Sequence, residues 1–145
     1  VYRYVRHRAA CGEPDGFVSV REMLECSIVS EAAQHIDDSH MQIMYDVISN
    51  MRECIDNDDF DGYVQQDIIF HMNLAESTGN HLLSGIISAL RQVFKEHISQ
   101  LDRKTAITSF KQHSCIAEAV RSGDSELAEK LMHEHISGTK DSYVS

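Results

Sequence analysis

Residues 65–80, QQDIIFHMNLAESTGN, contain the pattern that decides the fold of this chain. The stretch belongs to a predicted helix over residues 63–77, which Gly79 and Asn80 end because both residue types tolerate the left-handed backbone conformation. Asp67 and His71 are four residues apart, so they lie on one face of this helix, one turn from each other. A carboxylate and an imidazole placed in this way can reach the same ion.

The helical pattern continues through almost all of the chain outside that stretch. A first helix is predicted to start at Ser19, where Glu22 completes a capping box. Other helices are predicted over residues 39–55, 82–98 and 105–121, with a last helix capped by Asp124 or Ser125 and ended by Gly138. Because strand-like alternation of useful length is missing from the sequence, we predict an all-α fold. The expected architecture is a single antiparallel bundle of six to seven helices with a central metal or ligand cavity.

The predicted bundle occupies residues 18–138. Residues 1–17 contain the only proline and are predicted to be a tail or linker, and residues 139–145 a polar tail. The chain begins with Val, so we expect it to be a piece of a longer protein. The acidic stretch DNDDFDG at residues 56–62 lacks the spacing and final Glu of an EF-hand, which favours a solvated loop over a calcium site.

Composition limits the possible functions. A net charge of −10 argues against nucleic-acid binding by this segment, since phosphate binding needs clustered Lys and Arg. The apolar runs are too short to span a membrane, and a secretory signal sequence is not expected. The scattered cysteines predict reduced thiols and a cytoplasmic protein. These cysteines are Cys11, Cys26, Cys54 and Cys115.

Two later histidines complete a candidate metal site. His113 and His135 stand on different predicted helices, and together with Asp67 and His71 they offer one carboxylate and three imidazoles. This set suits a borderline divalent cation, with zinc preferred and nickel, manganese or iron as alternatives. Without a metal, the same residues would form a buried group of neutral histidines hydrogen-bonded to Asp67. His133 is two residues from His135 and is expected to point elsewhere.

Several short motifs occur in order along the chain. The first is Arg21, Glu25 and Ala32-Ala33; the second is Asp67, Phe70, His71 and Thr78-Gly79-Asn80; the third is His113, Ile116, Ala119-Val120, Gly123-Asp124, Ala128, Met132 and His135-Ile136. With these motifs, residues 18–137 resemble the C-terminal effector-binding (FCD) domain of FadR-type regulators in the GntR superfamily. Several motifs in the right order and spacing are far more specific than any one of them.

The resemblance implies a function. It places the metal ligands at Asp67, His71, His113 and His135, which favours the metal-binding branch of the family over the fatty acyl-CoA-binding branch. It also implies a small organic acid effector, such as a hydroxy acid or sugar acid, and a homodimer. DNA would be contacted only through a winged helix-turn-helix that this chain does not contain.

Three residues are predicted to contact the effector. Arg21 and Arg91 can each place a guanidinium fork on the oxygens of an acid, although both could instead be surface arginines. Asn80 is predicted to line the same pocket, with Ser77 or Thr78 as alternatives.

Sensing is not the only function that a metal site allows. A metalloenzyme whose centre is built from three histidines and one aspartate needs a general base that is not a ligand, and the nearest in sequence are Glu76 and Glu134. Neither is expected to point inward, so the sensor is preferred. A purely structural metal is the third possibility.

Overall fold

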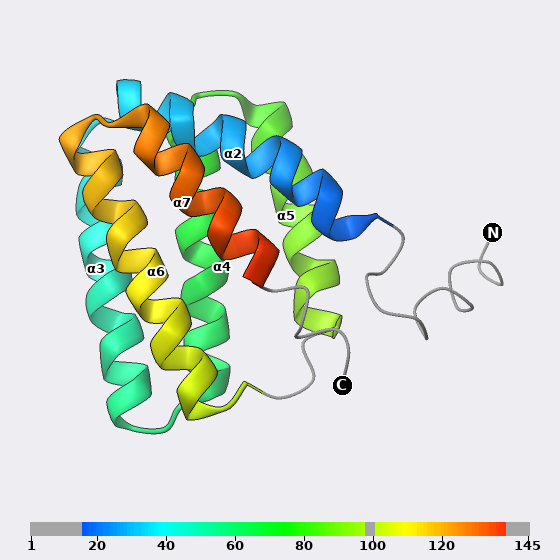
Figure 1. Cartoon of the computed structure of the whole chain (residues 1–145), viewed down its shortest axis with the longest axis vertical. Helices are drawn as coiled ribbons and strands as arrows, with labels where there is room; N and C mark the ends of the chain where they lie inside the picture. Colours follow the sequence, from blue (N-terminus) through cyan, green and yellow to red (C-terminus); the bar gives the residue numbers. More distant parts are fainter. Residues whose placement is uncertain (1–15, 98–100, 139–145) are drawn as a thin grey trace, which may run out of the picture.

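The computed structural model describes residues 16–97 and 101–138, and within them the chain forms six helices and no strand, which confirms the all-α prediction. Among the described residues, no helix is long and apolar enough to cross a membrane. The helices, labelled as in Figure 1, are α2 (Phe17–His35), α3 (Asp38–Asp56), α4 (Phe60–Ser77), α5 (His81–His97), α6 (Arg103–Ser122) and α7 (Ser125–Gly138).

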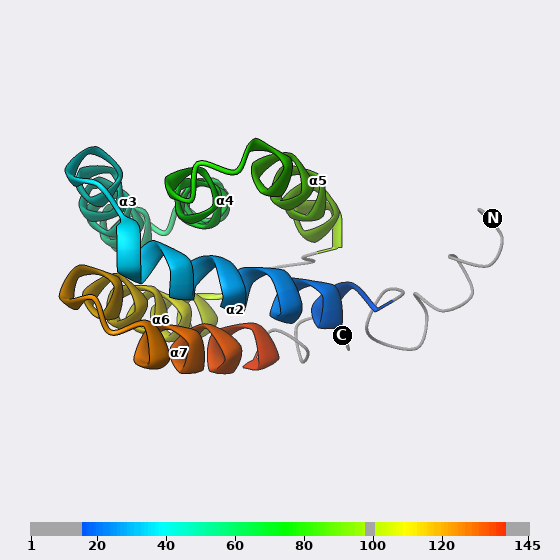
Figure 2. The ribbon, with the colours of Figure 1, turned by 90° about the horizontal axis from the view of Figure 1, so that it is seen from above.

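Helix α2 occupies the middle of the bundle. Figure 2 shows α3, α4 and α5 on one side of it and α6 and α7 on the other. The contacts agree, since α2 packs against α7, α4 and α6. Helices α3 and α4 form a second closely packed pair, and α5 packs on α4. A helix enclosed in this way buries residues on more than one face, and α2 buries Arg21 and Glu25 as well as its apolar residues.

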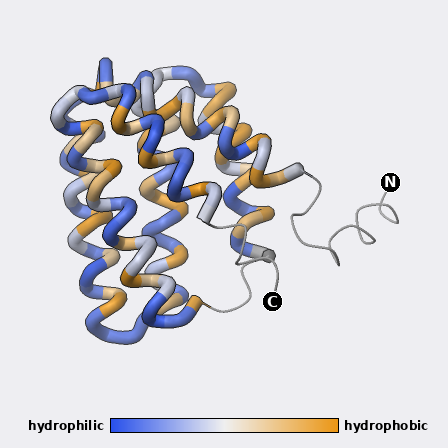
Figure 3. The backbone as a smooth tube through the Cα atoms, in the orientation of Figure 1, coloured by the Kyte–Doolittle hydropathy of each residue, from blue (hydrophilic) through white to orange (hydrophobic). Residues whose placement is uncertain are grey.

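An apolar core connects these helices. Hydrophobic residues recur along every helix of the tube in Figure 3, and the buried ones form one continuous cluster. Helix α3 shows the simplest pattern, because all of its buried residues are apolar. They are Met44, Val47, Met51 and Ile55.

Aspartate side chains cap the start of four helices: α3, α4, α6 and α7. Asp37, Asp59, Asp102 and Asp124 each accept a hydrogen bond from the backbone N–H three residues later. Because Asp59 caps α4, that helix starts at Phe60, and the predicted loop over residues 56–62 is largely helical. The prediction of a loop is therefore correct only for residues 57–59.

The start of the first described helix also differs from the prediction. Helix α2 begins directly after Gly16, whose φ is 74°, and Ser19 lies inside the helix. The predicted capping box at Ser19 and Glu22 is therefore wrong. The predicted helix end at Gly79 is confirmed, since this residue has the positive φ that glycine adopts without strain, and Gly123 ends α6 in the same conformation. Cys26, Cys54 and Cys115 are free thiols, and Cys11 lies outside the described residues.

Candidate metal centre and its cavity

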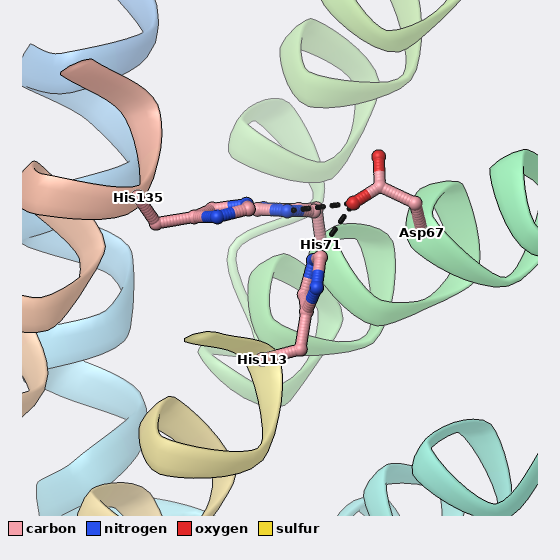
Figure 4. A group of neighbouring side chains, drawn as sticks. All are labelled: Asp67, His71, His113 and His135. Carbon is pink, nitrogen blue, oxygen red and sulfur yellow. Dashed lines mark ion pairs between the residues drawn. The ribbon is translucent and has the colours of Figure 1, made fainter. Parts of the chain in front are cut away.

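Four side chains from three helices meet in the interior of the bundle. Asp67 and His71 come from α4, His113 from α6 and His135 from α7 (Figure 4). All four are buried, and each offers one ligand atom such that these atoms lie within 4.8 Å of one another. Ligands bound at about 2.1 Å to one ion are at most about 4.2 Å apart, so a small closure would suffice for shared coordination. The buried cluster suggests a metal site.

Packing of the rings brings the histidines together. The rings of His71 and His135 are stacked, with centroids 5.5 Å apart, and the His113 ring meets His135 edge-on at 4.4 Å. Phe70 lies one residue before His71 and contacts the His113 ring at 4.6 Å. The apolar residue beside the ligand pair thus helps to fix the histidine of another helix.

The outer nitrogen of each histidine faces an acceptor of the protein. His113 Nδ1 is 2.8 Å from the carbonyl oxygen of Ser109, and His135 Nδ1 is 2.8 Å from Gln112 Oε1. His71 Nδ1 is 2.5 Å from a carboxylate oxygen of Glu25. An imidazole that donates its Nδ1 proton outward keeps the Nε2 lone pair available, which is the arrangement of most histidine ligands to metals.

The inner nitrogens of His71 and His113 lack hydrogen-bond partners among the described residues. Nε2 of His113 and of His71 lie 2.8 and 3.4 Å from Asp67 Oδ1. Neither contact has the alignment of a hydrogen bond, and the same is true of the close contact between His71 Nδ1 and Glu25. Buried polar atoms without partners are costly, by roughly 1–3 kcal/mol each. A cation between these atoms would supply the missing partner, so the residues fit a bound metal.

Two arginines and a second carboxylate surround the cluster. Arg91 donates from Nη1 to Asp67 at 3.1 Å and from Nη2 to Glu25 at 2.7 Å. Arg21 donates from Nε to the other oxygen of Glu25 at 2.7 Å. The exposed fractions of the two arginines are only 1%, so the alternative of surface arginines is wrong.

This network fixes the charges of the site. Burial raises the pKa of Asp67, but Arg91 and the neighbouring imidazoles hold that pKa well below its usual range. Glu25 behaves in the same way, since the two arginines and His71 outweigh its burial and keep its pKa low. Burial lowers the pKa of His113 and, with the adjacent histidines, lowers the pKa of His135 further. Both carboxylates are therefore ionised and both of these histidines neutral at pH 7.

A cavity of about 420 Å³ reaches the cluster. Its buried end contains Asp67, His135, Arg21 and Arg91, whereas exposed residues of α6 such as Lys104 line the other end. Pockets of this size hold small organic molecules. Polar side chains of α6 form one wall between the two ends: Thr105, Thr108, Ser109 and Gln112.

Asn80 does not join the site. It is exposed at the start of α5, where its side chain accepts hydrogen bonds from the backbone N–H groups of Leu82 and Leu83. Ser77 and Thr78 also bond locally, to carbonyl groups of α4, and neither lines the cavity. These residues looked like pocket residues because their motif is close to His71 in sequence.

Sequence reasoning gave no role to two residues that hold the histidines. Glu25 appeared only as part of a motif, although its i,i+4 spacing from Arg21 indicated a pair. Gln112 directly precedes His113, yet it contacts His135 on another helix, and no local signal predicts that contact. The alternative bases Glu76 and Glu134 are both exposed, as expected.

Comparison with known proteins now identifies the family. The FCD domain family matches residues 17–138, so the chain belongs to this family, the effector-binding domains of GntR/FadR-type regulators. The predicted resemblance is confirmed. Because the family is regulatory and not enzymatic, membership also supports the sensor interpretation over a metalloenzyme.

Individual relatives agree with this assignment. The HTH-type transcriptional repressor NanR of Escherichia coli K12 is 26% identical over 128 residues, which cover 83% of this chain and 46% of that protein. NanR of Salmonella newport is 26% identical over 124 residues, covering 83% and 47%. The chain thus spans about half the length of the curated relatives it matches.

Solved structures share the fold. Streptococcus agalactiae GntR superposes with a TM-score of 0.80 at 20% identity, covering 94% of this chain and 60% of that one. Escherichia coli McbR/YncC superposes with a TM-score of 0.74 at 13% identity, covering 86% and 64%.

Proposed function

We propose that this FCD domain is a metal-dependent sensor of a small hydroxy acid or sugar acid. One observation carries the proposal: three inward-facing imidazoles and a carboxylate meet at the buried end of a cavity that two buried arginines also line. Metal ligands alone would also suit a structural ion. Arginines beside an accessible cavity are what an organic anion requires.

The four clustered residues Asp67, His71, His113 and His135 would hold the metal. Three nitrogens and one oxygen suit zinc, with nickel, manganese or iron as alternatives. When bound, such an ion supplies Lewis acidity and open coordination positions for a carboxylate or hydroxyl group. The chain's own residues orient the imidazoles through Glu25, Ser109 and Gln112.

The acid would lie between the metal centre and the arginines. Arg21 and Arg91 bring two permanent positive charges to the buried end of the cavity. The hydroxyl and amide groups of α6 on the cavity wall can hydrogen-bond to hydroxyl groups of the ligand. Asn80 is left out of this proposal because it lies away from the cavity.

The regulatory output would be DNA binding by another part of a longer protein. The NanR relatives are HTH-type transcriptional repressors, and we infer that this domain acts within a regulator that carries an N-terminal winged helix-turn-helix. It would act as a homodimer in the cytoplasm. The acid must bind two arrangements of the helices with different affinity if it is to change DNA binding.

Elemental analysis tests the metal site first. The purified chain should contain about one equivalent of a transition metal, as expected of a single four-ligand site. The double variant His71→Ala, His113→Ala should contain none, whereas His133→Ala should keep the metal because His133 is exposed. An absence of metal after reconstitution would remove the basis for the proposed site.

Thermal unfolding with organic acids tests the sensor. A raised melting temperature in the presence of a hydroxy acid or sugar acid is expected for the metal-loaded chain. If metal binds but acids across both classes leave the melting temperature unchanged, the ion is structural and the sensor proposal is wrong.

A further inference from the structure

Glu25 touches both parts of the proposed site. It extends from α2 and is only 3% exposed. Its Oε1 is 2.5 Å from His71 Nδ1 and 2.7 Å from Arg91 Nη2, while Oε2 is 2.7 Å from Arg21 Nε. One carboxylate thus contacts a candidate metal ligand and both candidate anion-binding arginines.

The charges of this interior cancel in the absence of a metal. Two guanidinium groups face two carboxylates, Glu25 and Asp67, and all four are buried. Asp102 and Lys104 at the exposed end of the cavity are also of opposite charge. A divalent ion would leave two uncompensated positive charges in the buried region, which is costly unless an anion accompanies it.

We propose, on the basis of the proposed function, that Glu25 is a positioning residue that couples the metal to the acid. It holds the outer nitrogen of His71 so that the inner nitrogen faces the ion, and it neutralises the arginines until the ion arrives. With metal bound, the arginines have too few carboxylates to compensate them, and the acid supplies the missing negative charge. Metal and acid therefore bind with positive cooperativity, each raising the affinity of the other by the same factor.

A simpler role for Glu25 would be to fasten α2 to α5 through Arg91. The two roles predict different changes in metal and anion affinity when the negative charge of Glu25 is removed. Loss of a scaffold weakens metal binding and anion binding together. Loss of the coupling carboxylate weakens metal binding, because His71 loses the negative charge beside its outer nitrogen. It strengthens anion binding to the metal-free chain, because the arginines lose a competing carboxylate.

The experiment compares wild type with Glu25→Gln. Zn²⁺ affinity is measured by competition with a chromophoric chelator, and sulfate and lactate affinities are measured on the metal-free chain by calorimetry. In Glu25→Gln, Zn²⁺ should bind at least about 10-fold more weakly, as for other residues that orient metal ligands. The anions should bind about 10-fold more tightly, since one opposing charge has been removed from a buried site.

Two further variants make the result decisive. Glu31→Gln is the matched control, because Glu31 is exposed on the same helix, and both affinities should stay within about twofold of wild type. Arg91→Gln changes the charge of the site in the opposite direction, because it leaves excess negative charge. Zn²⁺ should therefore bind more tightly than to wild type, and the anions more weakly. Arg91→Gln also decides the question alone if Glu25→Gln does not fold.

The outcomes separate this inference from the proposed function. If wild type binds Zn²⁺ and an anion but Glu25→Gln weakens both, or Arg91→Gln weakens both, Glu25 is a scaffold and the inference is wrong while the sensor stands. The same holds if sulfate and lactate leave the Zn²⁺ affinity of wild type unchanged. If wild type binds none of Zn²⁺, Ni²⁺, Mn²⁺ and Fe²⁺, both proposals are overturned.

Discussion

Helices α3 and α4 pack side by side and have nearly the same length, but they bury different kinds of residue. Every buried residue of α3 is apolar, whereas α4 buries Asp67, His71 and Asn73 among its apolar side chains. Burial of polar groups is unfavourable unless they find partners. Helix α3 therefore contributes to the stability of the bundle through apolar packing, whereas α4 replaces part of that packing with the polar residues of the candidate site.

The largest loss of stability is expected from a change in the apolar face of α3. Met51 on α3 is fully buried, so Met51→Ala should lower the free energy of unfolding by about 3 kcal/mol. Urea unfolding of the metal-free variant measures this loss. The metal content of the folded variant should equal that of wild type. A variant that loses its metal while still folded would show that α3 supports the site after all.

Metal removal should affect stability next. With the proposed site, the folded chain would bind the ion and the unfolded chain would lack a preformed site, so metal at 100 times its dissociation constant should add about 2.7 kcal/mol to the free energy of unfolding. Thermal unfolding with and without a chelator gives the value. The double variant His71→Ala, His113→Ala should show no difference between the two conditions. A chelator effect that persists in this variant would place the metal elsewhere.

The neutral histidines predict a dependence on pH in the metal-free chain. Because the pKa values of His113 and His135 are lowered by burial, the unfolded chain takes up protons more readily than the folded chain below pH 6.5. The free energy of unfolding is therefore highest above pH 6.5 and decreases as the pH falls below that value.

Each of these two histidines can contribute a loss of up to about 2 kcal/mol between pH 6.5 and 5. His135→Gln should reduce the total loss by that amount, as measured by urea unfolding across the range. The lowered pKa values of Asp67 and Glu25 affect stability only at more acidic pH. If the free energy of unfolding changes with pH equally in wild type and in His135→Gln, His135 is not a buried neutral histidine.

The smallest effect should come from Asn80, which lies outside both regions. Asn80→Ala removes the cap of α5 and should cost about 1 kcal/mol in the free energy of unfolding. Acid binding, measured by calorimetry on the metal-loaded chain, should not change. A large loss of acid affinity would return Asn80 to the effector site, as the sequence first suggested.

The two helices also differ in what their sequences allow one to predict. The interior face of α3 follows from its apolar period, because Met44 and Met51 are spaced for one side of a helix. On α4, the i,i+4 spacing of Asp67 and His71 predicted a shared face, but only the packing of α6 and α7 brings the other histidines near it. His113 and His135 were grouped with this pair by residue type and helical placement, and the family resemblance gave the same set, but no local spacing predicts the long-range contacts.

Local sequence patterns do not predict that the network of arginines and carboxylates around the site is buried. Arg21 and Glu25 have the spacing of an ordinary exposed ion pair, and only the enclosure of α2 between two groups of helices places them inside. The capping box at Ser19 and Glu22 is wrong for another reason, because a serine followed three residues later by a glutamate can also lie inside a helix. Asn80 was selected from a motif close to His71 in sequence, and the structure places it at the cap of α5.

The packing of α2 against α7 has a consequence for how this domain is made. Arg21 comes from the first described helix and His135 from the last, so the site joins segments that are far apart in the sequence. A growing chain on the ribosome cannot assemble it until α7 has emerged, even if the other helices have already formed. Metal uptake should therefore wait until α7 has been synthesised, and chains that stop before α7 should be unable to respond to the acid.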